Sequence, residues 1–376
     1  MCRWCGATSG TVVLDLGDQP AADMFPRPGD RGPDPVHPLA MVLCSECSLA
    51  QLEWDPTSPD EPRGVEPAAL VDQAAEAIRA LGTAGLLPDR GRVLEHPSPH
   101  GGSWIPQLAA GGLEPATVGP ADVVVDSFGM MHEADQRSAL RRRTDELAEN
   151  GTLFLQFHSL AAIMRSGMWN ALRHGHFAYY STPVLIRMAQ ECGLRAVDAW
   201  QYDLYGGTVM LALRRTGEAT TRVRSLVQDE VACGVLDSRH VAGLQQAMTG
   251  SVRAIRSLVH RHRVAGRRVF GYSAASRAVA LLAAAGITTD EIIGIADASS
   301  AKEGRCLPGR RIPVITPAEL IAAHPDRVLL FVPDLAAEVR RQFPEIELQG
   351  GRWVVLEPQP RELEPVPVSV SIRRSP

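Results

Sequence analysis

Short apolar runs alternate with amphipathic segments along the chain from Arg92 to about residue 215. The runs RVLEH (92–96), ADVVVDSFG (121–129) and TLFLQFH (152–158) read as strands bounded by turn signals. Residues 137–151 and 182–192 have apolar positions at helical spacing, which predicts helices. RAVDAWQYDL and GTVMLALRR predict a closing pair of strands, broken at Tyr205-Gly206-Gly207. This alternation predicts an α/β fold with a largely parallel sheet and an antiparallel edge.

A second α/β unit follows a stretch that has no strand signal. The runs RRVFGYSAASRAVALLAAAGI, EIIGIAD, RRIPVI, RVLLFVP and RWVVLEP predict a second Rossmann-like sheet. A helix is also predicted at 67–82, whereas the first sixty residues are rich in turn residues and look too irregular to build a large core. The predicted organisation is a four-cysteine segment (1–60), a first α/β domain (61–216), a helical connector (217–263), a Rossmann-like C-terminal domain (264–361) and a tail (362–376).

Composition places this chain of 376 residues among ordinary soluble globular proteins, with 45% apolar and 22% charged residues. A net charge of −5 argues against nucleic acid as the main partner. The longest apolar runs, such as 278–287, are too short to span a bilayer, and the N-terminus lacks the apolar core of a signal peptide. A cytoplasmic location is therefore expected; the oligomeric state is left open.

Four of the seven cysteines form two CxxC knuckles, Cys2-x-x-Cys5 and Cys44-x-x-Cys47. Two such knuckles can close a tetrahedral four-thiolate site around Zn²⁺. Because protein thiolates take all four positions, this spacing predicts a structural rather than a catalytic zinc site. The remaining cysteines, Cys192, Cys233 and Cys306, stand alone and are interpreted as packing residues.

The order of these parts resembles the nucleotide-sugar C-methyltransferases, which methylate C3 of dTDP-4-keto-deoxysugars on the way to the branched sugars of antibiotics. The resemblance covers nearly the whole chain. Its motifs are the two knuckles, His132 in DSFGMMHEADQ, the loop RHGHFAYYS, the turn LYGGT (204–208), the glycine turn GYSAASRA (271–278) and the segment DASSAKEGRCLPGRRIPV (297–314).

The resemblance implies that a histidine removes the C3 proton and that the enolate attacks the methyl group of S-adenosylmethionine (SAM). The family's base lies in a loop of the form Tyr-x-Glu-His, which here reads Arg173-His174-Gly175-His176. His176 therefore stands at the base position, and His132 matches a second active-site histidine. Imidazole, which titrates near neutral pH, suits this role.

Other site residues are expected on both α/β domains. His174 and Tyr205 are further candidates for contact with the sugar. The resemblance implies that Gly271, Ser273 and the helix start after them hold the diphosphate of a dTDP-sugar, with Arg277 adding charge.

The cofactor region departs from the family pattern E-x-G-x-x-x-G, which here reads Glu95-His96-Pro97-Ser98-Pro99-His100-Gly101. Proline replaces the first glycine and removes an N–H. Only 26 residues separate Glu95 from Asp122, where two strands and their helices would need roughly 50–60 residues. If SAM binds, Glu95, Gly101 and Gly102 are the expected contacts.

These departures lead to a first hypothesis of SAM-independent acid/base chemistry on a dTDP-4-ketohexose, such as epimerisation, tautomerisation or pyranose–furanose isomerisation. The second hypothesis is SAM-dependent C3-methylation through an atypical pocket. The third is a non-catalytic partner that binds nucleotide sugar. The histidines also leave open a catalytic metal, for which His96, His100, His132 and His158 are candidate ligands, and a purely structural role. The run Arg141-Arg142-Arg143 is interpreted as a solvated helix face.

Overall fold

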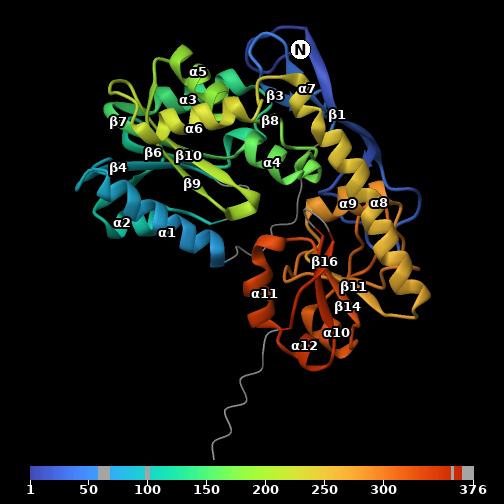
Figure 1. The fold of residues 1–376 in the computed structure, drawn as a ribbon. Coiled ribbons are helices and arrows are strands. Elements are labelled where there is room, and N and C mark those ends of the chain that lie inside the picture. Colours follow the sequence, from blue (N-terminus) through green and yellow to red (C-terminus); the bar gives the residue numbers. More distant parts are fainter. Residues whose placement is uncertain (58–67, 98–101, 357–359, 366–376) are drawn as a thin grey trace, which may run out of the picture.

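A computed structural model describes residues 1–57, 68–97, 102–356 and 360–365. These residues form three sheets, and the fold is of the mixed α/β class predicted above (Figure 1). In the described part of the chain, no helix is both long and apolar enough to cross a membrane. The predicted division of the chain at residues 60, 216, 263 and 361 stays a prediction.

The first α/β sheet has the strand order β5-β4-β6-β7-β10-β9. Strands β4 to β7 run parallel, and β10 pairs antiparallel with both β7 and β9, as the sequence predicted. The strands are β4 (Gly91–His96), β5 (Leu113–Ala116), β6 (Ala121–Ser127), β7 (Leu147–His158), β9 (Arg195–Tyr202) and β10 (Thr208–Arg214).

Helices cover this sheet and short 3₁₀ turns join its strands. The helices are α1 (Ala68–Thr83), α2 (Ile105–Ala110), α3 (Gln136–Asp145), α4 (Leu160–Ser166) and α5 (Thr182–Glu191). The 3₁₀ turns are η1 (Met130–His132), η2 (Trp169–Ala171) and η3 (Leu204–Gly206).

The strand that follows β4 in the chain, β5, lies on one side of it in the sheet, and the next strand, β6, lies on the other side. A ligand crevice is therefore expected at the carboxyl ends of β4 and β6.

Two expectations about this sheet were wrong in detail. The predicted helix 137–151 ends at Asp145, and β7 already begins at Leu147, so the Asn150-Gly151 pair lies inside a strand. A register shift between Ala121 and Val123 accommodates these extra residues. Of the two strands expected to be missing after Glu95, one is present as β5, whose sequence LEPA has no strand pattern; its proline is tolerated because β5 is an edge strand.

The N-terminal segment contributes a separate sheet of order β1-β2-β3-β8. Its strands are β1 (Gly10–Pro20), β2 (Val36–Cys44), β3 (Ala50–Leu52) and β8 (Ala178–Tyr179), the last coming from the first α/β domain. The segment is more regular than its turn-rich sequence predicts, because β1 and β2 form a long antiparallel pair. Their buried side chains, such as Leu14 and Met41, share one core with helices α8 and α9, so this sheet depends on the rest of the chain for its packing.

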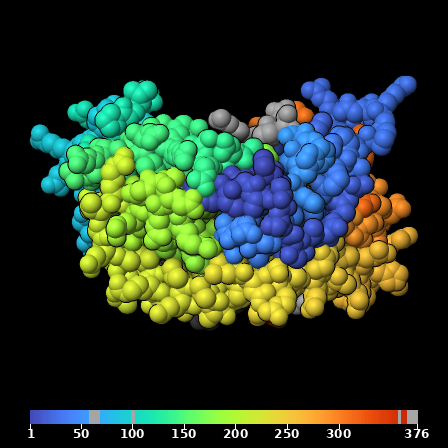
Figure 2. All heavy atoms as spheres, turned by 90° about the horizontal axis from the view of Figure 1, so that it is seen from above, coloured from blue at the N-terminus to red at the C-terminus, as the bar shows by residue number. Residues whose placement is uncertain are grey.

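The connector is helical, as predicted, with α6 (Thr221–Ala232), α7 (Ser238–Val241) and α8 (Gly243–Val264). Helix α6 packs on β9 and α5 of the first sheet, while α8 packs on β1 and on α9 and β11 of the C-terminal domain. Figure 2 shows this connector running along one side of the molecule from one α/β domain to the other, with the N-terminal segment between them.

The C-terminal domain is a second parallel sheet of order β13-β12-β11-β14-β15-β16, with an antiparallel last strand. Its ligand-binding position is expected at the carboxyl ends of β11 and β14, where the strand order reverses. The strands are β11 (Val269–Tyr272), β12 (Ile295–Ala296), β13 (Val314–Ile315), β14 (Arg327–Leu330), β15 (Arg352–Val355) and β16 (Arg361–Glu362). The helices are α9 (Ser276–Ala285), α10 (Pro317–Ala322), α11 (Ala336–Gln342) and α12 (Glu345–Leu348), with the 3₁₀ turn η4 (Pro333–Leu335).

Candidate active site and metal centre

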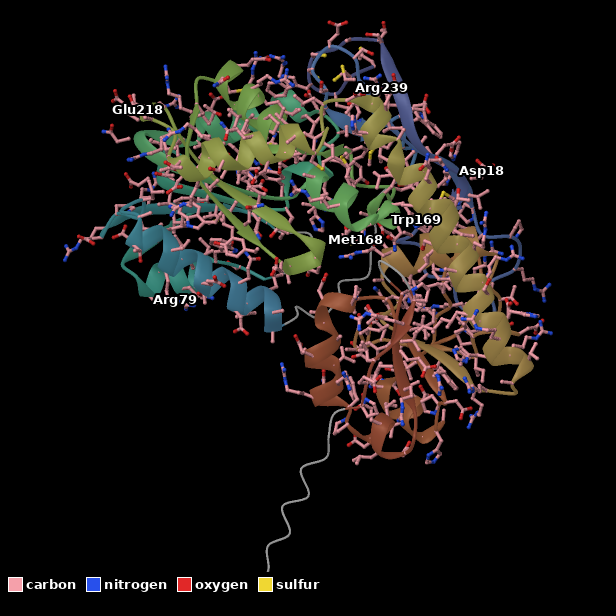
Figure 3. All side chains as sticks on the ribbon, in the orientation of Figure 1. Asp18, Arg79, Met168, Trp169, Glu218 and Arg239 are labelled. Atoms are coloured by element: carbon pink, nitrogen blue, oxygen red, sulfur yellow. The ribbon has the colours of Figure 1, made fainter. Side chains whose placement is uncertain are left out.

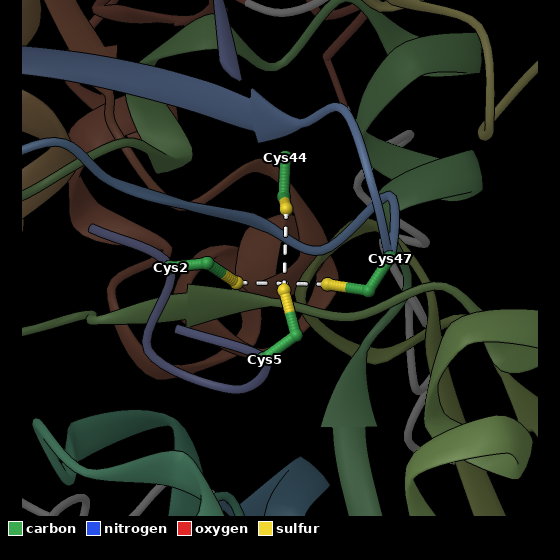
Figure 4. A group of neighbouring side chains, drawn as sticks. All are labelled: Cys2, Cys5, Cys44 and Cys47. Carbon is green, nitrogen blue, oxygen red and sulfur yellow. Dashed lines mark hydrogen bonds between the residues drawn. The ribbon is translucent and has the colours of Figure 1, made fainter. Parts of the chain in front are cut away.

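The four predicted cysteine ligands meet at one point, as Figure 4 shows. Their sulfur atoms all lie within 4.8 Å of one another, and Cys2 Sγ lies 3.5 Å from Cys47 Sγ. Four thiolates around a tetrahedral Zn²⁺ with bonds of about 2.3 Å would be about 3.8 Å apart, so this donor set fits zinc. A hydrogen bond from the Cys47 thiol lowers the pKa of Cys2 to about 4, as expected for thiols that lie close enough to share protons.

The first knuckle is anchored to the first α/β domain through Trp4, which is buried. The Arg137 guanidinium stacks on the Trp4 ring at 4.4 Å, and Arg137 Nε donates to the Trp4 carbonyl oxygen. Trp4 Nε1 and Arg137 Nη2 both donate to the Glu191 carboxylate. From the second knuckle, the Cys47 carbonyl oxygen accepts a hydrogen bond from Arg187. The cysteine cluster therefore fixes the N-terminus against helices α3 and α5.

The two histidines predicted to carry proton chemistry lie in contact with each other. The ring centroids of His132 and His176 are 4.5 Å apart, and the rings are nearly perpendicular at 89°. His132 ends the turn η1 after β6, and His176 lies in the loop before β8. The amide of Phe177 donates to the Met131 carbonyl oxygen at 2.7 Å, which joins the two segments directly. We call these two side chains the histidine pair.

A buried carboxylate shapes the turn that carries His132. Asp126, fully buried at the end of β6, accepts hydrogen bonds from the amides of Gly129 (2.7 Å) and Met130 (3.1 Å). Its other partner is the guanidinium of Arg143, which also pairs with Glu133 at 2.7 Å. The interpretation of residues 141–143 as a solvated helix face was thus wrong for Arg143, whose side chain is 1% exposed.

Gln136 completes the support of this turn. Its side-chain amide donates to the carbonyl oxygens of Met130 and Glu133, on either side of His132. Its side-chain oxygen accepts a hydrogen bond from Tyr180, a residue of the segment that follows His176. Burial raises the pKa of Tyr180, so its hydroxyl stays protonated and acts as a donor. A connected polar network therefore holds both members of the histidine pair.

Arg143→Met is expected to lower the free energy of unfolding by about 3 kcal/mol, because it leaves the Asp126 carboxylate buried without its cationic partner. Urea denaturation measures this change. The matched control is Arg142→Met, whose side chain is 48% exposed and should cost less than about 0.5 kcal/mol. Equal effects of the two substitutions would contradict the assigned role of Arg143.

The loop RHGH is held from the N-terminal segment. Gly175 has φ +81°, a conformation that favours glycine, and its amide donates to the Asp55 carboxylate at 2.6 Å. Arg173 is buried beside Asp23 at 3.5 Å. His174 lies with Nε2 3.2 Å from the Pro38 carbonyl oxygen and contacts the ring of His37, and burial lowers its pKa. The structure thus brings His176 to His132 and directs His174 to the N-terminal sheet.

Tyr205 lies in a second group, at the junction of the two α/β domains. Its ring stacks on His158, with centroids 5.6 Å apart and planes within 12°. Phe128 contacts both rings, and the Arg277 guanidinium of the C-terminal domain lies 5.9 Å from the Tyr205 ring. Arg277 also reaches Met168, which Figure 3 shows at this junction. Tyr205 has φ +52°, a strained value of the kind that clusters at ligand sites.

In the predicted SAM region, loop groups and a cavity lie beside Glu95. The Glu95 carboxylate accepts hydrogen bonds from Ser103 Oγ and from the Trp104 amide (2.7 Å), so loop groups already engage it. Beside it lies a cavity of about 180 Å³, lined in part by Glu95, Gly102 and Ser127. Sites for small molecules usually measure about 300–1,000 Å³. Gly101 and His100 lie outside the described residues.

His96, a candidate metal ligand in the sequence, pairs with a carboxylate. His96 Nε2 lies 2.7 Å from the Glu146 carboxylate, on α3's carboxyl end, and burial lowers its pKa. Among the described residues, the four cysteines are the one group of three or more His, Cys, Asp or Glu side chains that lie close enough together to hold a metal ion. The catalytic-metal alternative therefore has no supporting geometry in that part of the chain.

The glycine turn of the C-terminal domain lies at the carboxyl end of β11. A side chain at Gly271 would collide with Phe331 and Ile295, and Ser273 has φ +72°. The Ala274 amide donates to the Asp297 carboxylate, and Lys302 Nζ, the chain's single lysine, donates to the Ala274 carbonyl oxygen at 3.0 Å. Sequence reasoning missed Asp297 and Lys302 as supports of this turn, although both stand in the quoted segment 297–314.

Comparisons with known proteins agree with this architecture. One family model, "C-methyltransferase C-terminal domain", matches residues 203–358, and another, "Putative zinc binding domain", matches residues 2–61. C-methyltransferase NovU of Streptomyces niveus is 28% identical over 403 residues, which cover 96% of each chain. Along nearly its whole length, the chain is therefore similar to C-methyltransferases.

Two solved methyltransferases align with about two fifths of the chain. Magnesium protoporphyrin IX methyltransferase ChlM of Synechocystis PCC 6803, with bound SAH, is 11% identical and covers 38% of this chain and 82% of its own, with a TM-score of 0.30. N-methyltransferase NodS of Bradyrhizobium japonicum WM9, in complex with SAH, is 15% identical and covers 40% and 91%, with a TM-score of 0.30.

The similarity to C-methyltransferases confirms the resemblance found in the sequence. It also favours the second functional hypothesis, C-methylation, over the SAM-independent isomerisation that the sequence analysis put first. The isomerase prediction receives no support from these relatives.

Proposed function

We propose that this protein is an enzyme that removes a proton next to the carbonyl of a nucleotide-linked keto sugar, and that C-methylation of the sugar is the overall reaction. The proposed proton removal rests on the contact between His132 and His176, whose ring centroids are 4.5 Å apart. The full-length similarity to C-methyltransferase NovU supports C-methylation as the overall reaction. The sugar is proposed to be a dTDP-4-ketohexose of antibiotic biosynthesis.

In this proposal His176 is the base. It is held at a buried position by the Gly175 turn and by the Phe177–Met131 hydrogen bond. Neutral imidazole accepts the proton from the carbon beside the carbonyl, and the electron pair of that C–H bond moves into the enolate. His132, which meets His176 edge to face, is proposed as the partner acid that stabilises the enolate oxygen.

The C-terminal domain is proposed to hold the nucleotide. Gly271 and Ser273 lie at the carboxyl end of β11, where parallel sheets bind ligands, and the ten-residue helix α9 starts just after them. Arg277, on the first turn of α9, reaches the stack of Tyr205 and His158 across the domain junction. A diphosphate near Arg277 would therefore place the attached sugar toward the first α/β domain.

Methylation needs a methyl donor, which for this family would be SAM. Near Glu95 the described residues line a cavity of about 180 Å³, below the usual range for small-molecule sites, and residues 98–101 of the predicted SAM region lie outside the described part of the chain. This observation favours a second candidate function, SAM-independent isomerisation of the same keto sugar by reprotonation of the enolate. Both candidates share the proton removal assigned to the histidine pair. The cysteine cluster is proposed to hold a structural Zn²⁺.

Two measurements separate these functions. With a dTDP-4-ketohexose in D₂O, we expect deuterium to enter next to the carbonyl without added cofactor, detected by mass spectrometry. Calorimetry with S-adenosylhomocysteine is expected to show micromolar binding if methylation is the reaction. Deuterium uptake with a new sugar isomer and no binding of S-adenosylhomocysteine would establish isomerisation. Neither uptake nor cofactor binding would leave the role of a non-catalytic partner that binds nucleotide sugar.

A further inference from the structure

Arg3, the residue after the first cysteine, contacts both segments that carry the histidine pair. Its guanidinium carbon lies 4.7 Å from the centre of the Phe177 ring, and Phe177 follows His176 directly. Its Nη1 atom donates to the Ala134 carbonyl oxygen at 3.3 Å, two residues after His132. One side chain therefore touches both loops, on the side of the cysteine cluster.

The backbone of Arg3 is held in place independently of these contacts. Cys2 and Cys5 on either side of it belong to the cysteine cluster. The Arg3 amide also donates to the buried side-chain oxygen of Gln51 at 2.8 Å. Gln51 lies on β3, opposite Ala178 of β8, which is two residues after His176. The origin of the Arg3 side chain is thus fixed relative to the strand that follows the catalytic loop.

The two loops are joined directly by the 2.7 Å hydrogen bond from Phe177 to Met131, and Arg3 adds a link from the side of the cysteine cluster. The planar Arg guanidinium can stack on an aromatic face and donate in its own plane at the same time, which a lysine ammonium does less well. In the arrangement seen here, the stacking contact orients the His176 loop and the in-plane donor orients the His132 loop.

We propose that Arg3 is a positioning residue that transmits the geometry of the cysteine cluster to the histidine pair. The inference rests on the proposed function, because it assigns Arg3 to the same proton-removing site. It gives the metal knuckle a second role: besides stabilising the N-terminal segment, it sets how His132 and His176 face each other. The metal itself takes no part in the proton transfer.

The test compares Arg3→Met with Arg137→Met. Arg137 also stacks on the first knuckle, on Trp4, but its contacts run to Trp4 and Glu191 and not to the histidine loops. For Arg3→Met we expect kcat of deuterium exchange to fall about tenfold or more, with KM changed less than twofold and one metal still bound per chain, because small misplacements of catalytic groups are costly. Arg3→Lys should recover part of the rate. Arg137→Met should leave the exchange rate within about twofold.

A second readout does not depend on activity. Histidine-labelled protein is titrated by NMR, and the ring signals of His132 and His176 are expected to shift in Arg3→Met but not in Arg137→Met. Unchanged ring signals in Arg3→Met, or equal losses of kcat in both variants, would overturn the proposal. Loss of the bound metal in Arg3→Met would also overturn it, because the residue would then serve the cluster alone. Shifted signals in a wild-type protein that shows no exchange would refute the proposed function and leave the positioning role of Arg3 intact.

Discussion

His176→Ala is expected to lower the rate of deuterium exchange into the keto sugar by about 10²–10⁴-fold, the usual contribution of a positioned general base. The effect should appear in kcat, because the substitution removes the proposed base and leaves the proposed nucleotide contacts of the C-terminal domain, near Gly271 and Arg277, in place. Rapid-quench mass spectrometry of the sugar measures the rate, and binding of dTDP measured by calorimetry should change less than about twofold.

The matched control is His260→Ala, which changes an exposed histidine on α8 and should leave the rate unchanged. His132→Ala should also slow exchange. The double variant should lose little more than His176→Ala alone, since groups that act as a unit are not additive. A His176→Ala protein that folds and exchanges at the wild-type rate would remove the histidine pair from the mechanism.

Cys44→Ser is expected to reduce the bound metal from one to nearly zero per chain and to destabilise the protein strongly. Structural zinc contributes roughly 10–16 kcal/mol in small zinc-finger peptides, and part of that free energy holds β1, β2 and the knuckles together here. Even a loss of about 5 kcal/mol would lower the melting temperature by about 10–20 °C in a domain of 150–250 residues. Elemental analysis and thermal denaturation measure the two effects.

Cys233→Ser is the control, because Cys233 is half-buried in the connector and is not a member of the cluster. It should keep the metal and change the melting temperature by no more than a few degrees. A chelator should reproduce the Cys44→Ser result in the wild-type protein and should slow deuterium exchange as well. Full metal content in Cys44→Ser would contradict a four-thiolate site.

Sequence motifs identified both members of the histidine pair but did not show which histidines would meet. The positions of His132 and His176 were recognised from two loops more than forty residues apart, and the structure brings their rings together. His174, a further candidate in the sequence, lies against the N-terminal sheet instead. Adjacent residues of a loop point in different directions, and the positive φ of Gly175 between them decides which one enters the site.

Elements with weak local signals were missed for a related reason. Strand β5 has no alternating pattern, and it exists because the edge of β4 offers free hydrogen-bonding groups to any extended segment beside it. The burial of Arg143 was also missed, because the sequence of three consecutive arginines does not indicate which of them faces the protein interior. Only the carboxylates of Asp126 and Glu133, brought close by the fold, distinguish Arg143 from its neighbours.

The sequence by itself determined the two α/β units, the order of the parts, the cysteine ligands and the histidine positions, because periodicity and motif spacing are local properties of the chain. Tertiary structure alone decided which histidines meet, which arginine is buried, how small the cavity beside Glu95 is, and that Arg3 of the first knuckle touches both loops of the histidine pair. These features depend on contacts between segments far apart in the sequence, and their packing is settled only when the three sheets assemble.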